Sequence, residues 1–91
     1  MAYVYILESL RDGRYYIGST KDLRKRLQHH WRGFTPSTKR FGEIRLVLHQ
    51  KYNTLREARF IESRLKQLKR KDYIRKIIKD GFIKIKLNIP E

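Results

Sequence analysis

One carboxylate stands where the helical pattern of this sequence predicts an apolar side chain. The apolar face of the predicted helix is formed by Leu55, Ala58, Ile61, Leu65 and Leu68. At about 100° per residue, Glu62 projects into the same arc. Burying a carboxylate is costly unless it is paired with a cation or binds a metal. Glu62 is therefore either a metal ligand or one half of an ion pair, and the residues alone leave both open.

Arg26 and His30 form a second candidate pair, four residues apart on an earlier predicted helix. The apolar stripe of that helix is Leu23, Leu27 and Trp31. Arg26 and His30 fall side by side at the border of this stripe. They could belong to a site at the helix edge. The structural alternative is a histidine at the margin of the core and an arginine whose aliphatic stem covers apolar surface.

Tyr5 and Tyr16 lie in two predicted strands on either side of the turn signal Asp12-Gly13. In a tight two-residue turn Tyr16 would face Ser9, and Tyr5 would lie roughly 13 Å further along. A site shared by both tyrosines needs a wider loop, roughly residues 8–13, and we predict that wider loop. The alternative is that both are ordinary strand residues with polar tips.

The elements that must position these residues follow from periodicity and turn chemistry. Strands are predicted at residues 2–8, 15–18 and 44–49, and helices at 20–33, 54–68 and 73–80, with Thr20 and Asn53 or Thr54 as N-caps and Gly81 as a stop. The order β-β-α-β-α-α predicts an α+β fold, a small three-stranded antiparallel sheet flanked by helices. The alternating tail 83–89 could add an edge strand. We expect a single domain, residues 1–91.

Charge is the strongest global feature of the 91 residues. Lys and Arg total 23 against 9 Asp and Glu, a net charge of +14. Such a chain attracts polyanions, so nucleic acid is the expected partner, with a ribosome-associated basic protein as the alternative. The absence of cysteine excludes disulfides, zinc–thiolate sites and cysteine nucleophiles. Neither a secretory signal nor an apolar run long enough to span a membrane is evident, so we expect a cytoplasmic protein.

Three segments in order resemble the GIY-YIG nuclease superfamily. They are Val4-Tyr5-Ile6-Leu7, Tyr16-Ile17-Gly18-Ser19-Thr20 and Asp22-Leu23-Arg24-Lys25-Arg26-Leu27. The likeness is greatest to short stand-alone members that are similar to the N-terminal nuclease domain of the excision-repair endonuclease. It covers about residues 2–70. The first motif is Tyr3-Val4-Tyr5 and lacks the glycine, and the late asparagine of several members has no clear match.

The resemblance implies a set of functional positions. Tyr5 and Tyr16 match the motif tyrosines, Gly18 the motif glycine, Arg26 the arginine eight residues further on, His30 a histidine one turn later, and Glu62 the metal-binding glutamate. For nucleic-acid contacts we expect Lys21, Arg24, Lys25, Lys39 and Arg40. The implied cofactor is Mg²⁺ or Mn²⁺.

The implied activity is metal-dependent hydrolysis of DNA phosphodiester bonds, structure-directed or weakly specific, as in DNA repair. Glu62 would hold the metal, Arg26 the scissile phosphate, and Tyr5 or Tyr16 the attacking water, with His30 orienting a tyrosine. The alternatives are a non-catalytic nucleic-acid-binding module on the same fold and a basic assembly protein. An enzyme requires Tyr16, Arg26 and Glu62 to line one cleft, whereas a binding module does not.

Overall fold

An antiparallel sheet of three strands divides the molecule into two layers. The computed structural model describes residues 1–32, 43–68 and 70–87. The central strand β1 (Ala2–Ser9) pairs with β2 (Tyr15–Thr20) on one side and with β3 (Ile44–Tyr52) on the other, in the order β2-β1-β3. β2 is therefore an edge strand. The predicted α+β class and the order β-β-α-β-α-α are confirmed.

The hairpin between β1 and β2 closes through a loop wider than a two-residue turn. The Ser9 amide donates to the Arg14 carbonyl at 2.8 Å, and the Gly13 amide donates to the Ser9 carbonyl at 2.9 Å. This register places Tyr5 opposite Gly18 and Leu7 opposite Tyr16. Tyr5 and Tyr16 are thus diagonal neighbours on one face of the sheet, as the wider loop predicts.

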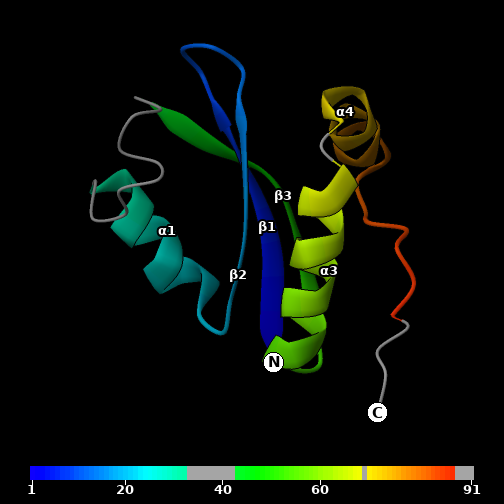
Figure 1. The fold of residues 1–91 in the computed structure, drawn as a ribbon. Coiled ribbons are helices and arrows are strands. Elements are labelled where there is room, and N and C mark those ends of the chain that lie inside the picture. Colours follow the sequence, from blue (N-terminus) through cyan, green and yellow to red (C-terminus); the bar gives the residue numbers. More distant parts are fainter. Residues whose placement is uncertain (33–42, 69, 88–91) are drawn as a thin grey trace.

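Helices cover both faces of the sheet, and β2 runs between them (Figure 1). Helix α1 (Leu23–Trp31) covers one face, where Tyr5, Leu7 and Leu27 form a small core. Helices α3 (Leu55–Leu68) and α4 (Lys71–Asp80) cover the other. The main core there includes Val4, Ile6, Leu48, Ala58, Ile61, Leu65, Ile74 and Ile77. No helix in the described residues is long and apolar enough to cross a membrane.

The helix ends show which polar residues begin and stop each helix. Asp22, rather than the predicted Thr20, caps α1, because its carboxylate accepts the Lys25 amide at 3.0 Å. Thr54 caps α3 by accepting the Glu57 amide at 3.1 Å, and the Glu57 side chain accepts the Thr54 amide in return. Gly81 ends α4 with a φ of 84°. The predicted end of the first helix, at residue 33, lies outside the described residues.

Two expectations from periodicity are wrong. Trp31 belongs to the predicted apolar stripe but is 58% exposed, because it is the last residue of α1 and lies beyond the small core under the helix. The alternating tail is not a strand over residues 83–87. Its buried Ile83 instead packs on the main core, and the Gln50 side chain accepts the Ile83 amide at 2.7 Å. The Gln50 side chain thus binds the backbone amide that a neighbouring strand would bind if this segment were part of the sheet.

Candidate active site

Gly18 leaves room for the side chain of Tyr5 beneath the edge strand. A Cβ atom at position 18 would lie 2.5 Å from the Tyr5 hydroxyl and 2.6 Å from Cζ, well inside van der Waals contact. Tyr5 is fully buried on the neighbouring strand and extends its ring directly under Gly18. The motif glycine is therefore required here for space, since a side chain would displace the phenol.

Tyr5, Tyr16 and His30 form an aromatic cluster between the sheet and α1. The Tyr5 hydroxyl and His30 Nε2 lie 2.8 Å apart in a buried hydrogen bond. The ring centroids of Tyr16 and His30 are 5.0 Å apart in an edge-to-face arrangement, and those of Tyr5 and Tyr16 are 6.3 Å apart. His30 comes from α1 and the tyrosines from two strands, so the cluster fixes the helix to the sheet.

Burial separates the roles of the two tyrosines in this cluster. Burial, with the nearby charge of Arg26, lowers the pKa of His30 to about 4, so the imidazole is neutral at physiological pH. Burial, followed by the effect of Tyr16, raises the pKa of Tyr5 far above that of an ordinary phenol. Tyr5 therefore stays a protonated phenol at neutral pH and cannot take a proton from water. Tyr16, which is partly exposed on β2, is the tyrosine of the cluster that can reach a bound substrate.

Arg26 brings a positive charge to the solvent side of the aromatic cluster. It lies on α1 one turn before His30, and its charge helps to lower the pKa of His30 and partly opposes the rise in the pKa of Tyr5. Its side chain is exposed and lines a small depression with Thr20, Asp22, Lys25 and His29. Lys21, Arg24 and Lys25 are exposed around the start of the same helix. The other predicted contacts, Lys39 and Arg40, lie outside the described residues.

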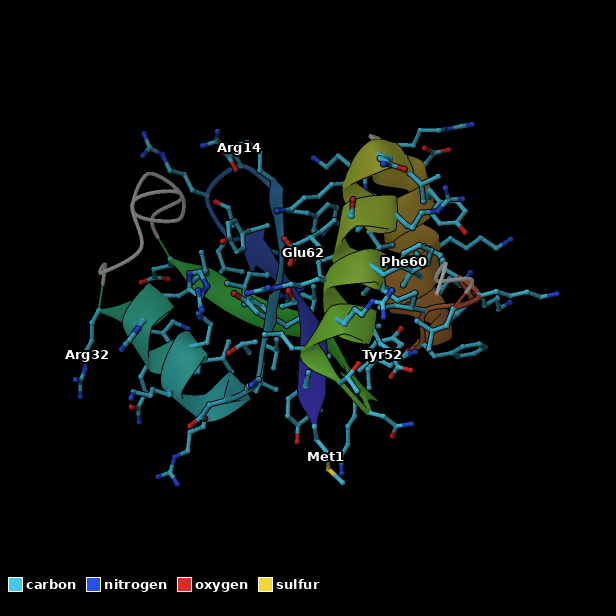
Figure 2. All side chains as sticks on the ribbon, turned by 60° about the horizontal axis from the view of Figure 1, so that its bottom comes forward. Met1, Arg14, Arg32, Tyr52, Phe60 and Glu62 are labelled. Carbon is cyan, nitrogen blue, oxygen red and sulfur yellow. The ribbon has the colours of Figure 1, made fainter. Side chains whose placement is uncertain are left out.

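Glu62 occupies the opposite side of the edge strand. Figure 2 shows it between α3 and β2. The Ser19 hydroxyl donates to one of its carboxylate oxygens, and Lys66 Nζ lies 2.6 Å from the other. The side chain is 20% exposed, so it stands at the border of the apolar face rather than inside it. The ion pair that the helical pattern left open is thus present.

The edge strand separates the predicted site residues into two groups. Glu62 lines a depression with Arg59, Ser63, Lys66 and Gln67, whereas Arg26 lines a different one. That Tyr16, Arg26 and Glu62 line one cleft stays a prediction. The two groups are nevertheless neighbours, because Gly18 covers Tyr5 on one face and the next residue, Ser19, binds Glu62 on the other. The charge of Glu62 also contributes to the raised pKa of Tyr5.

The donors at Glu62 suit a hard divalent cation. A carboxylate and a hydroxyl supply oxygen ligands, and Mg²⁺ commonly takes one or two protein carboxylates and completes its shell with water and phosphate. Within residues 1–32, 43–68 and 70–87 no group of three or more His, Cys, Asp or Glu could hold a metal. A cation at Glu62 would have to displace the Lys66 ammonium, whose side chain is 54% exposed and can turn toward solvent.

Two partners of Glu62 were not anticipated from the sequence. Lys66 lies one helical turn after Glu62, a spacing at which oppositely charged side chains meet. Ser19 follows the motif glycine, and alternation along β2 alone directs it to the face opposite Tyr16. Lys66 could have been found by the spacing of charges, whereas the Ser19 contact required knowing which face α3 covers.

Comparison with known proteins relates the chain to one family. The sequence model of the GIY-YIG catalytic domain family matches residues 1–77. A UPF0213 protein of Streptococcus pneumoniae is 41% identical over 70 residues, which are 76% of this chain and 70% of that protein. The solution structure of a UPF0213 protein from Bacillus halodurans is similar with a TM-score of 0.56 and 34% identity, covering 89% of this chain and 87% of that one.

Proposed function

The chain belongs to the GIY-YIG catalytic domain family, a nuclease superfamily whose members typically bind DNA, and we propose that it is a metal-dependent endonuclease acting on DNA phosphodiester bonds. The observation that carries the proposal is the pair of functional groups on either side of Gly18-Ser19. The aromatic cluster with Arg26 lies on one face of this segment, and Glu62 lies on the other. A phosphodiester laid over the edge of β2 would contact both.

Arg26 and Glu62 have complementary roles toward the phosphate. A guanidinium can hold two phosphate oxygens at once and offset the charge that develops as water attacks. Glu62, with the Ser19 hydroxyl, would hold Mg²⁺ or Mn²⁺ once Lys66 withdraws. When bound, the metal supplies Lewis-acid polarisation of the phosphate and stabilises the leaving oxygen.

Tyr16 is the residue of the aromatic cluster that would position the attacking water. Its partly exposed phenol can accept a hydrogen bond from that water. The neutral imidazole of His30 packs on the Tyr16 ring and is hydrogen-bonded to the Tyr5 hydroxyl. His30 and Tyr5 therefore act by fixing Tyr16 in place. In this assignment Tyr5 and His30 are positioning residues and Tyr16 contacts the reacting atoms.

Binding to DNA would depend mainly on phosphate contacts. Lys21, Arg24 and Lys25 present an exposed basic surface beside Arg26, and Lys39 and Arg40 stay candidates for the same role. Contacts of this kind follow the backbone and carry little sequence information. We therefore propose a structure-directed or weakly specific nuclease whose affinity falls as salt is added.

Cleavage by the Glu62→Gln variant tests the proposal. Branched, single-stranded and duplex DNA are incubated with wild type and variant, with and without Mg²⁺ or Mn²⁺. Because the metal contributes several kcal/mol to transition-state stabilisation, the variant should cleave about a hundredfold more slowly or worse. Glu57→Gln is the matched control, since glutamine preserves the capping box of the same helix and activity should be unchanged. Metal-independent cleavage, or full activity of Glu62→Gln, would reject the assignment.

A non-catalytic nucleic-acid-binding module is the second candidate. It is favoured by the fact that both oxygens of Glu62 already have protein partners, Ser19 and Lys66. In that case wild type binds DNA with a strong dependence on salt but cleaves none of the three substrates with either metal.

A further inference from the structure

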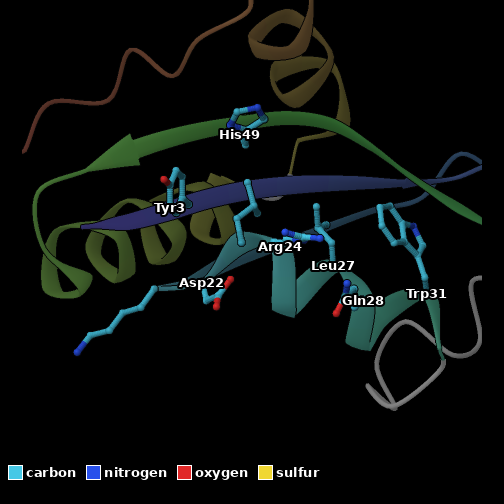
Figure 3. A pocket seen from close by; sticks show the side chains of 9 residues that line it. Tyr3, Asp22, Arg24, Leu27, Gln28, Trp31 and His49 are labelled. Atoms are coloured by element: carbon cyan, nitrogen blue, oxygen red, sulfur yellow. The ribbon is translucent and has the colours of Figure 1, made fainter.

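A groove between α1 and the sheet lies on the side of the helix away from the aromatic cluster. Its volume is about 660 Å³, within the range of small-ligand sites. Figure 3 shows Arg24, Leu27 and Trp31 lining it from α1, and Tyr3 and His49 from the strands. Lys21 completes the basic end of the groove. We call this surface, which Asp22, Leu23 and Gln28 also line, the Trp31 groove.

The two sides of α1 carry different chemistry. At about 100° per residue, Arg26 and His30 point to one side of the Leu23–Leu27 stripe, and Trp31 and Arg24 point to the other. The first side meets Tyr5 and Tyr16, as the hydrogen bond and the ring contacts show. The second side opens into the Trp31 groove. One short helix therefore separates the proposed centre of hydrolysis from a surface of aromatic and basic groups.

The strand side of the groove adds aromatic rings to the same face of the sheet. His49 lies directly opposite Tyr5 in the β1–β3 ladder, and Tyr3 is two residues before Tyr5, so both point to the α1 face. His49 is exposed and Tyr3 is half-buried. Lys51, opposite Tyr3, extends positive charge along the same face. Flat rings with cations at their margin match a nucleotide, which has a flat base and an anionic phosphate.

The charge in the groove also favours a nucleotide. Lys21 and Arg24 are exposed, and the one acidic lining residue, Asp22, is occupied as the cap of α1 through its contact with the Lys25 amide. A basic rim on a chain of net charge +14 selects an anion over an apolar or cationic partner. The indole of Trp31, 58% exposed, offers the largest accessible ring of the groove.

We propose that the Trp31 groove binds an unpaired nucleotide of a DNA strand adjoining the scissile phosphate. The base stacks on Trp31, and Lys21 and Arg24 hold its phosphates. This inference rests on the proposed function and sharpens it by naming the substrate class. A base inside a duplex is already stacked and paired, so the groove favours single-stranded or branched DNA over continuous duplex.

Trp31 is the single tryptophan of the chain, so its fluorescence reports directly on the groove. Wild type is titrated with oligothymidylate of about 12 nucleotides, and separately with the same strand annealed to oligoadenylate. A chelator is present throughout, so that binding is measured without hydrolysis. We expect quenching of the indole by the single strand at lower concentrations than by the duplex.

Variants link the fluorescence to affinity. By anisotropy of a labelled oligothymidylate, Trp31→Ala should bind about fivefold to a hundredfold more weakly, because stacking on an aromatic side chain is lost. Trp31→Phe keeps a flat ring and should retain most of the affinity. Phe82→Ala removes another exposed aromatic, outside the groove, and serves as the matched control with unchanged binding.

Each outcome decides the proposal. Quenching with weakened binding by Trp31→Ala, partly restored in Trp31→Phe, supports it. Unquenched fluorescence on saturation, equal affinity of wild type and Trp31→Ala, or preference for duplex overturns it. Because these measurements require no metal, they test the groove even if the chain cleaves no DNA. If Trp31→Ala cleaves DNA and binds it with normal affinity, the proposed nuclease function is retained and the role of the groove is rejected.

Discussion

Replacement of Gly18 by alanine tests whether the contact between Tyr5 and the edge strand supports the aromatic cluster. The added Cβ would lie 2.5 Å from the Tyr5 hydroxyl and 3.0 Å from Cε1. Tyr5 is fully buried, and its hydroxyl is held by His30, so the ring cannot withdraw without losing that bond. Overpacking of this kind costs about 1–3 kcal/mol. The reduced entropy of the unfolded chain returns about 0.4–1 kcal/mol.

The net loss should be about 1–2 kcal/mol in the free energy of unfolding, which lowers Tm by roughly 5–15 °C in a domain of this size. Thermal unfolding followed by circular dichroism measures it in wild type, Gly18→Ala, Tyr5→Leu and the double variant. Without the tyrosine ring, alanine at position 18 should be tolerated, so the two effects should fail to add by about 1 kcal/mol. Strictly additive effects, or a Gly18→Ala variant as stable as wild type, would refute the steric explanation.

Three further predictions concern the neighbouring groups. As pH falls from about 6.5 to about 4, the free energy of unfolding of wild type should decrease by up to about 3 kcal/mol, because His30 binds a proton in the unfolded chain but stays neutral in the folded protein. Denaturant titrations at several pH values measure this decrease, and the His30→Asn variant should lack it. Lys66→Met should bind Mn²⁺ about twofold to fivefold more tightly by electron paramagnetic resonance, because the competing ammonium is gone; weaker binding would show that Lys66 helps rather than competes. Arg26→Lys should lower kcat about a hundredfold with little change in KM, since an ammonium cannot make the bidentate contact; an unchanged kcat would remove Arg26 from the reaction.

Much of the fold can be predicted from local patterns in the sequence. The strands at Ala2–Ser9 and Ile44–Tyr52 and the helix at Leu55–Leu68 each carry enough periodic apolar residues to be predicted. The prediction of a strand in the tail was wrong, because Ile83 is apolar for packing against the main core and not for pairing in the sheet. The prediction that Trp31 is buried was wrong, because an apolar stripe on a helix does not show where the sheet surface beneath it ends.

The site was predictable in its parts more than in its arrangement. The proximity of Tyr5 and Tyr16 followed from requiring a wide hairpin loop. Helix geometry predicted only that His30 lies beside Arg26, and its contact with a tyrosine was expected from the family resemblance alone. The placement of Glu62 could not be predicted in this way, because sequence periodicity does not say which face of the sheet each helix covers. With α1 and α3 on opposite faces, Arg26 and Glu62 approach the edge strand from different sides.

The central claim is that groups on both sides of β2 act on one phosphodiester. It is tested most directly by a crystal structure of the Tyr16→Phe variant with branched DNA and Mn²⁺, located by its anomalous scattering. We predict Mn²⁺ on the Glu62 carboxylate, with Lys66 turned away and a backbone phosphate bound between the metal and Arg26. Mn²⁺ at other carboxylates, or a DNA backbone that contacts Arg26 but passes far from Glu62, would contradict the claim.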